Sequence, residues 1–180
     1  MKVIGFCGLP GSGKSTAINA VRDLGIVVNM GDIIRSEAKN RKIEPSDENL
    51  GKIATELREK HGKSIIAQKC VELIKKLKAE VIFVDGIRSL YEVEVFRKYW
   101  KFPIIEIATK NEIRHKRISD RARTDDSITI SNMTERDKRE IDLGIKEVLL
   151  RADYKISNDS TVDELNKRMR KIILKILENY

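Results

Sequence analysis

Short apolar runs alternate along the chain with longer stretches of helical periodicity, a pattern typical of βαβ units around a parallel sheet. Five runs rich in β-forming residues predict strands: Lys2–Cys7, Ile26–Met30, Val81–Asp85, Pro103–Thr109 and Asp153–Ser157. The first, third and fourth runs are mainly apolar, as expected of strands that are covered on both faces. The pattern therefore predicts an α/β fold, a three-layer sandwich with a five-stranded parallel sheet.

The last segment, 162–177, has the periodicity of an amphipathic helix. Its apolar side chains recur at helical spacing, with Lys and Arg on the opposite face. They are Leu165, Met169, Ile172, Ile173 and Ile176. We expect this helix to pack on the sheet rather than on a membrane or a nucleic acid.

Two polar helical stretches interrupt this pattern, at 31–79 and 112–144. With 180 residues and 41% hydrophobic content, the chain fits one domain, whose core would comprise 1–30, 80–111 and 145–180. Each stretch follows the C-terminal end of a predicted strand, where ligands bind in open α/β sheets. We therefore interpret 31–79 as an acceptor-binding insertion and 112–144 as a lid.

The net charge of +8 favours an anionic partner without choosing between nucleotide, nucleic acid and membrane surface. Cys7 and Cys70 lack the paired spacing of a zinc or redox site, so we expect two buried apolar side chains. The apolar run Val3–Cys7 is too short for a signal peptide or a membrane span, which predicts a cytoplasmic protein. We expect His61 and His115 to be surface residues.

A phosphate-binding loop follows the first predicted strand directly. Residues 8–15 read GLPGSGKS and match G-x-x-x-x-G-K-[ST] between a strand and a helix. Its glycines let backbone N–H groups converge on a phosphate, Lys14 neutralises the transferred phosphoryl group, and Ser15 offers a hydroxyl to magnesium. The predicted ATP ligands are Gly8, Pro10, Gly11, Ser12, Gly13, Lys14, Ser15 and Thr16.

The apolar run that ends at Asp85 supplies the second half of such a site. Four β-forming residues place one carboxylate at the end of a strand expected beside the loop. We predict that Asp85 and Ser15 hold Mg²⁺, with Asp85 bound through water.

The segment after the second strand, Met-Gly-Asp-Ile-Ile-Arg at 30–35, together with Asp-Gly-Ile-Arg at 85–88, resembles nucleoside monophosphate kinases, adenylate kinase in particular. The likeness spans nearly the whole chain. It implies that Arg35 and Arg88 grip an acceptor phosphate and that Asp32 contacts the substrate. Arginine forms bidentate bonds to phosphate, which supports both assignments. Compared with the family's D-G-F-P-R, one residue is missing before Arg88, so its angle of approach can differ.

Residues 117–126 resemble a shortened lid of the same kinases. Lys110–Arg123 holds six Lys or Arg against two acidic residues, a net +4 of the chain's +8. The likeness implies that Arg117 stacks on adenine, that Arg121 and Arg123 contact the transferring phosphoryl group, and that Asp125 and Asp126 brace the arginines. A further lid arginine could be Arg136 or Arg139. Such cations stabilise the charge of phosphoryl transfer while a lid excludes water.

The stretch 152–158, with the helix after it, resembles instead the closing segment of dephospho-coenzyme A kinases, which borders the adenine pocket. Those kinases carry D-A-D where this chain has Met30-Gly31-Asp32, so only Asp32 remains as a base for a hydroxyl acceptor. A phosphate acceptor needs no base. The sequence therefore favours transfer from ATP to a phosphate such as that of a nucleoside monophosphate, and leaves a hydroxyl acceptor as the alternative.

Two other functions fit less well. The segment 109–112 is distantly similar to the base-reading motif of GTPases, but no D-x-x-G turn follows Asp85. A nucleic-acid-associated ATPase would suit the basic segments, yet aromatic residues make up 5% of the chain and do not interleave with the basic cluster. A small-molecule kinase is therefore preferred, with nucleic acid as a possible partner.

Overall fold

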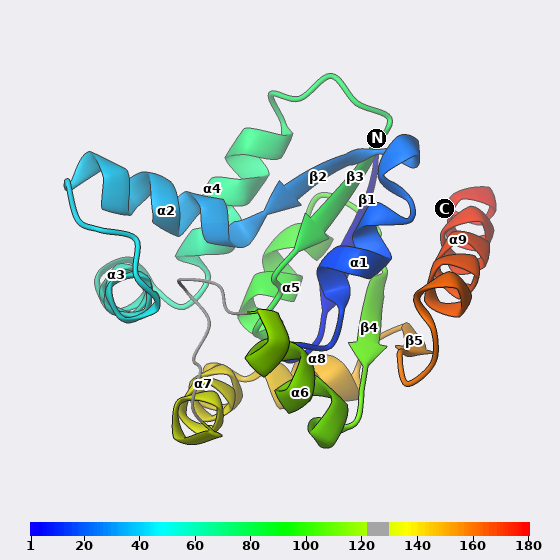
Figure 1. The fold of residues 1–180 in the computed structure, drawn as a ribbon. Helices are drawn as coiled ribbons and strands as arrows, with labels where there is room; N and C mark the ends of the chain where they lie inside the picture. Colours follow the sequence, from blue (N-terminus) through cyan, green and yellow to red (C-terminus); the bar gives the residue numbers. More distant parts are fainter. Residues whose placement is uncertain (122–129) are drawn as a thin grey trace.

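The computed structural model describes residues 1–121 and 130–180 and contains one parallel sheet of five strands in the order β2-β3-β1-β4-β5 (Figure 1). The strands are β1 (Lys2–Cys7), β2 (Ile26–Asn29), β3 (Val81–Asp85), β4 (Ile104–Ala108) and β5 (Tyr154–Ser157). All five predicted strands are confirmed, with ends that differ by at most one residue. Met30, predicted to end the second strand, instead begins a helix.

The helices in the first two thirds of the chain are mostly short. They are α1 (Lys14–Asn19), the 3₁₀ turn η1 (Arg22–Leu24), α2 (Met30–Asn40), α3 (Asp47–His61), α4 (Ile65–Ile74) and α5 (Leu90–Arg97). The remaining ones are α6 (Asn111–Arg121), α7 (Ile130–Leu143), α8 (Ile145–Leu150) and α9 (Val162–Glu178).

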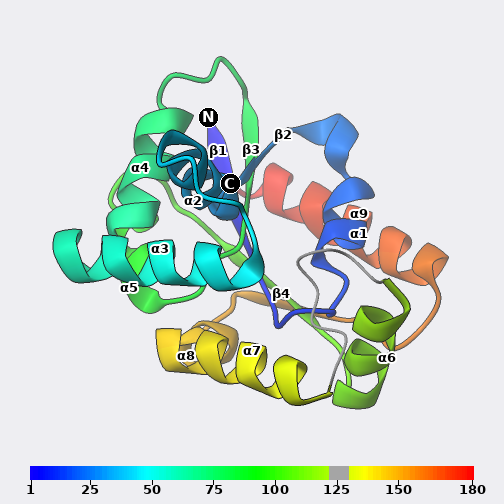
Figure 2. The same cartoon turned by 60° about the vertical axis from the view of Figure 1, so that its left-hand side comes forward.

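Alternating side chains of the strands feed two separate apolar clusters, one on each face of the sheet. Ile4 and Phe6 of β1 join α1 and α9 on one face, where Phe6 meets Phe83 edge to face with ring centroids 5.7 Å apart. On the other face, Val3 and Cys7 join residues of α2, α3, α4, α5 and α8. The predicted three-layer sandwich is confirmed, and Figures 1 and 2 show its layers from two sides.

The segment 31–79 contains both peripheral and core helices. Ile66, Ala67 and Ile74 of α4 are almost fully buried in the same cluster as the strands, so α4 contributes to the core layer. Cys70 of α4 and Cys7 are both buried, as predicted. Among the residues that the structure describes, no helix is long and apolar enough to cross a bilayer.

The sheet topology brings the carboxyl ends of β1, β3 and β4 next to one another. Phe6 of β1 pairs in register with Asp85 of β3, and Cys7 pairs with Glu106 of β4. Since β1 lies between β3 and β4 and the strand order reverses there, the loop after β1 emerges at the topological switch point where open α/β sheets bind ligands.

Candidate functional site

The loop after β1 has the backbone of a phosphate cradle. Gly8, Gly11 and Gly13 all have positive φ, at 149°, 76° and 91°. A Cβ on Gly13 would lie 2.2 Å from Nδ2 of Asn158, so the loop needs glycine there for close approach as well as for its conformation. The buried hydroxyl oxygen of Ser12 has no hydrogen-bond partner in the described part of the chain. Such a loop fits the phosphates of a nucleotide.

The strands beside the loop hold it in place. The carbonyl oxygen of Ser12 accepts hydrogen bonds from Nδ2 of Asn158 at 2.8 Å and from Oγ1 of Thr109 at 2.9 Å. Asn158 follows β5 and also donates its backbone N–H to Ala108 at 2.7 Å. The segment after β5 therefore helps to hold the phosphate loop, and its implied place beside an adenine stays a prediction.

Lys14 begins α1 and lies inside the loop. Its Nζ donates to the carbonyl oxygen of Gly8 at 2.6 Å and to that of Leu9 at 3.4 Å. Burial lowers the pKa of Lys14, and the negative charges of Asp85 and Glu140 oppose that shift. An ammonium group held here can neutralise phosphate charge.

Asp85 ends β3, one strand away from the loop. Its Oδ1 is buried and, within residues 1–121 and 130–180, has no hydrogen-bond partner. Burial raises the pKa of Asp85, and Lys14 and Arg88 act against this. Ser15 is exposed in the first turn of α1. A buried carboxylate with a spare oxygen and an exposed hydroxyl are oxygen donors of the kind that Mg²⁺ prefers.

A cavity of about 300 Å³ lies beside the cradle, between α1, α6 and α9. Its lining consists of Gly11, Gly13, Thr16, Arg117, Asp120, Asn158, Val162 and Leu165. Nη2 of Arg117 donates to the carbonyl oxygen of Asn158 at 3.1 Å, while its Nη1 is buried without a partner among the described residues. The structure thus brings Arg117 beside the phosphate loop, and its implied stacking on adenine stays a prediction.

A second cavity, of about 270 Å³, is bordered by α2, α3, α7 and the loop after β3. We call it the arginine cavity, because five of its lining side chains are Arg35, Arg58, Arg88, Arg136 and Arg139. A larger hollow of about 700 Å³ adjoins it and shares Arg58 and Arg88. Phosphate and carboxylate groups are the usual partners of clustered arginines.

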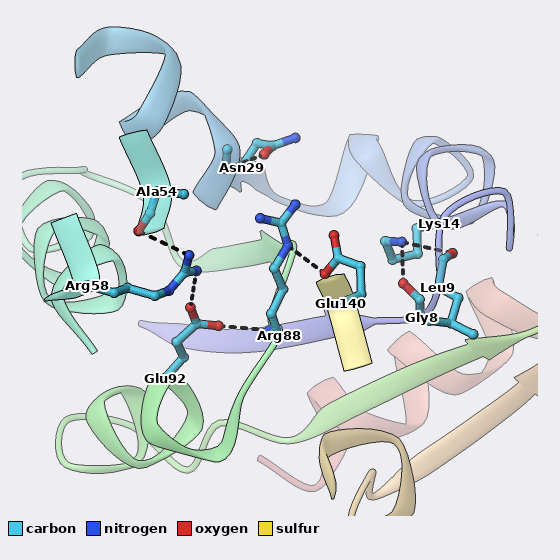
Figure 3. Close-up of polar contacts among 10 residues, drawn as sticks. Gly8, Leu9, Lys14, Asn29, Ala54, Arg58, Arg88, Glu92 and Glu140 are labelled. Atoms are coloured by element: carbon cyan, nitrogen blue, oxygen red, sulfur yellow. Dashed lines mark hydrogen bonds and ion pairs between the residues drawn. The ribbon is translucent and has the colours of Figure 1, made fainter. Parts of the chain in front are cut away.

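Carboxylates contact Arg58 and Arg88 in the structure. Nη2 of Arg58 lies 3.1 Å from Oε1 of Glu92, a fully buried side chain, and Oε2 of Glu92 accepts the backbone N–H of Arg88 at 2.8 Å. The Nε of Arg88 lies 3.0 Å from Glu140, which projects from α7 between Arg88 and Lys14 (Figure 3). Glu140 makes the largest contribution to raising the pKa of Arg88.

The remaining predicted site residues have different surroundings. Arg35 lines the arginine cavity and pairs with Asp32 at 2.8 Å, but the Asp32 side chain is 67% exposed and is not among the described lining residues. His61 is exposed, whereas His115 is one-third exposed and lies 3.9 Å from Asp137. Arg123, Asp125, Asp126 and the side chain of Arg121 lie outside what the structure describes, so their predicted lid roles stay predictions.

Sequence reasoning did not single out Glu140, Glu92 or Arg114. Arg114 is 1% exposed and contacts both the phosphate loop and α7. All three lie in helices dense in charged residues, where nothing in the spacing marks which charge points inward. One weak signal was present, because Arg114 precedes Arg117 by one helical turn and shares its face.

Comparisons of the sequence with known proteins found a family model and several relatives. A family model described as an AAA domain matches residues 7–134. The chain is 45% identical over 184 residues to the UPF0200/UPF0201 protein of Archaeoglobus fulgidus, covering 99% of this chain and 57% of that one. It is 44% identical over 179 residues to the UPF0200 protein of Methanothrix thermoacetophila, covering 96% and 97%. The chain thus spans little more than half of the first relative.

Solved structures of similar fold include P-loop kinases. TT1252 from Thermus thermophilus superposes with a TM-score of 0.62 at 19% identity, over 97% of both chains. Shikimate kinase from Acinetobacter baumannii, solved with shikimate, gives 0.60 at 17% identity, over 99% of this chain and 94% of that chain. At such identities the likeness shows the fold alone, a P-loop kinase fold.

Proposed function

This chain belongs to the UPF0200 family and contains an AAA domain with a P-loop kinase-like fold, and from that premise we propose an ATP- and magnesium-dependent phosphotransferase. Its acceptor is a small phosphorylated molecule such as a nucleoside monophosphate. One observation carries the proposal: Glu140 lies between Arg88, which lines the arginine cavity, and Lys14 of the glycine-rich phosphate cradle (Figure 3), so two anionic groups can be bound near each other.

In the proposed reaction, an oxygen of the acceptor phosphate forms a bond to the γ-phosphorus of ATP. The bond from that phosphorus to the β–γ bridging oxygen breaks, and ADP leaves with the electron pair. A phosphate oxygen is anionic at neutral pH, so the step requires no general base. Catalysis then depends on positioning and on neutralising charge.

In this proposal, different residues of the chain position the nucleotide and the acceptor and neutralise their charge. The cradle and Lys14 bind the β- and γ-phosphates, Arg117 borders the adenine, and Arg35 and Arg88 hold the acceptor phosphate. Magnesium, when bound, neutralises charge on the phosphate oxygens, and Ser15 and Asp85 would hold it. Arg121 and Arg123 are the proposed lid cations.

A hydroxyl acceptor, as in dephospho-coenzyme A kinases, is the second candidate, and Glu140 favours it. This carboxylate faces the arginine cavity, whereas the base that the sequence suggested, Asp32, is largely exposed. A hydroxyl acceptor needs such a carboxylate to take its proton.

The direct test is an acceptor screen. Nucleoside monophosphates and dephospho-coenzyme A are incubated with ATP, Mg²⁺ and protein, and products are identified by mass. The proposal expects a product that is one phosphoryl group heavier than a phosphorylated acceptor. Lys14→Ala serves as the folded control and should lower turnover by about a hundredfold or more. Turnover that survives this change, or a product formed only from a hydroxyl, would contradict the proposal.

A further inference from the structure

Arg114 is a fully buried cation beside the phosphate loop. Its Nη1 donates to the carbonyl oxygen of Pro10 at 2.6 Å, and Nη1 and Nη2 donate to Asp137 at 3.2 and 2.5 Å. Nε and Nη2 lie 3.3 and 3.0 Å from Oδ1 of Asn111. A guanidinium stays charged when buried and needs acceptors in place of water. Hydrogen bonds to Pro10, Asn111 and Asp137 therefore hold Arg114 in place and connect the phosphate loop with α6 and α7.

Pro10 and Gly11 of the phosphate loop pack directly on α6. A Cβ on Gly11 would lie 2.8 Å from the carbonyl oxygen of Arg114 and 2.9 Å from Cγ1 of Ile118. Pro10, the residue before Gly11, accepts the Arg114 hydrogen bond. Pro10 and Gly11 therefore cannot shift far relative to α6 without breaking this packing.

Asp137 extends the connection to α7, which borders the arginine cavity. One helical turn after Asp137, Glu140 contacts Arg88, and Arg139 forms an ion pair with Asp47 of α3. Since residues three apart share a helix face, a small rotation of α7 about its axis alters the Asp137 and Glu140 contacts together. A chain of contacts therefore runs from Pro10 through the buried Arg114 and the partly exposed Asp137 to the acceptor side.

We propose that Arg114 and Asp137 are positioning residues that couple the phosphate loop to α7, so that binding at the cradle and binding at the arginine cavity influence each other. Neither side chain takes part in bond making. Arg114 acts through the Pro10 carbonyl, and Asp137 holds Arg114 to α7. The acceptor half of this statement rests on the proposed function, whereas the link between loop and helix does not.

The first test measures binding of MgATP, without acceptor or turnover, to Asp137→Asn. The neutral amide weakens the hold on Arg114, and we expect the dissociation constant to rise on the order of tenfold or more, as misplaced binding groups do. Asp137→Glu, which keeps the charge, should recover most of the affinity. Glu135→Gln makes the same kind of charge change at an exposed position of α7 and should leave affinity unchanged.

A second control must show whether lower stability alone weakens MgATP binding. Ile176 is buried in α9, on the α1–α9 face of the sheet, and Ile176→Val lowers stability without touching the loop. If Asp137→Asn binds MgATP as Ile176→Val does, the pair is structural and the positioning role is refuted.

A second measurement uses the unaltered protein and holds even if Asp137→Asn fails to fold. Amide exchange is followed with and without a non-hydrolysable ATP analogue and Mg²⁺. Coupling predicts slower exchange in residues 134–138, around Asp137, which do not line the cavity beside the cradle and which precede Glu140, the residue of α7 that lies near Lys14. Protection confined to the loop and α6 would overturn the inference. An acceptor screen without product would instead count against the proposed function and leave this result intact.

Discussion

The Nε of Arg88 lies 3.0 Å from a carboxylate oxygen of Glu140, so an acid from α7 holds the arginine that the resemblance assigns to the acceptor phosphate. The contact is close enough for an ion pair, yet that oxygen has no aligned hydrogen bond within the described residues. It is also buried, with the Glu140 side chain 12% exposed. An arriving phosphate must therefore compete with this carboxylate for Arg88.

Replacing Glu140 by Gln should strengthen the binding of a free anion. The amide is nearly the same size but leaves Arg88 unpaired and removes a negative charge near Lys14. We expect inorganic phosphate to bind a few-fold more tightly to the MgADP-loaded protein, in line with the roughly 1 kcal/mol of a partly exposed ion pair. Titration calorimetry measures this, with Glu135→Gln as the control on the same helix. Unchanged phosphate affinity would show that Glu140 does not compete.

Removing Arg58 should destabilise the fold through Glu92. The Arg58 side chain is 11% exposed and Glu92 is fully buried, so Arg58→Met leaves an uncompensated charge in the core. Such a loss costs about 3–5 kcal/mol, measured by urea unfolding. Adding Glu92→Gln removes the stranded charge and keeps an acceptor for the Arg88 N–H, so the double variant should regain most of the loss.

The exposed pair Lys52–Glu48 provides the matched comparison for that prediction. Both side chains are at least 70% exposed, and Lys52→Met should cost below about 1 kcal/mol. Equal losses for Lys52→Met and Arg58→Met would mean that the Arg58–Glu92 pair does not anchor α3 to α5.

The buried carboxylate of Asp85 should lower the stability of the fold, although we propose that it binds magnesium. Burial raises its pKa above the ordinary 3.8, so the folded protein holds the proton more tightly than the unfolded chain does. The ionised carboxylate therefore costs stability at every pH above the raised value, and this cost fades as the pH falls through that value toward 3.8. Asp85→Asn should accordingly be more stable than the unaltered protein at neutral pH, with a gap that closes in acid.

The same substitution should damage activity, because an amide is a poor ligand for magnesium. We expect turnover of MgATP to fall about a hundredfold or more. Thermal melts across a pH series and turnover assays on one preparation provide both readings. A variant that is both less stable at neutral pH and fully active would contradict the assigned position of this carboxylate.

The strands and the cradle could be predicted from the sequence because their signals are local. Apolar runs such as 81–85 and the spacing of Gly8, Gly13 and Lys14 define their own structure. The arginine cavity could be predicted only in part. Arg35 and Arg88 came from a resemblance, whereas Arg58, Glu92 and Glu140 meet through contacts between α3, α5 and α7 that no short-range pattern specifies.

The same difference between local sequence signals and contacts between elements applies to Asp32. The motif at 30–35 suggested that Asp32 contacts the substrate, and this stays a prediction. In the structure α2 begins at Met30, and its buried side is formed by Met30, Ile34 and Ala38. Asp32 lies on a different side of the helix, exposed and paired with Arg35. A motif fixes residue types, while the packed face of the helix decides where each one points.

Substitutions of Arg35 and Asp32 distinguish a phosphate acceptor from a hydroxyl acceptor. Under the phosphate interpretation, Arg35→Ala removes a bidentate phosphate ligand, and KM for the acceptor should rise by about tenfold or more. Asp32→Asn should leave kcat within a few-fold of its original value, because a phosphate oxygen needs no base and this carboxylate is exposed. Steady-state kinetics with the acceptor found in the screen measures both. If Asp32→Asn, or Glu140→Gln, abolishes kcat while ATP and acceptor still bind, that carboxylate takes a proton in the reaction. The acceptor group would then be a hydroxyl, because only a hydroxyl has a proton that must be removed for it to attack.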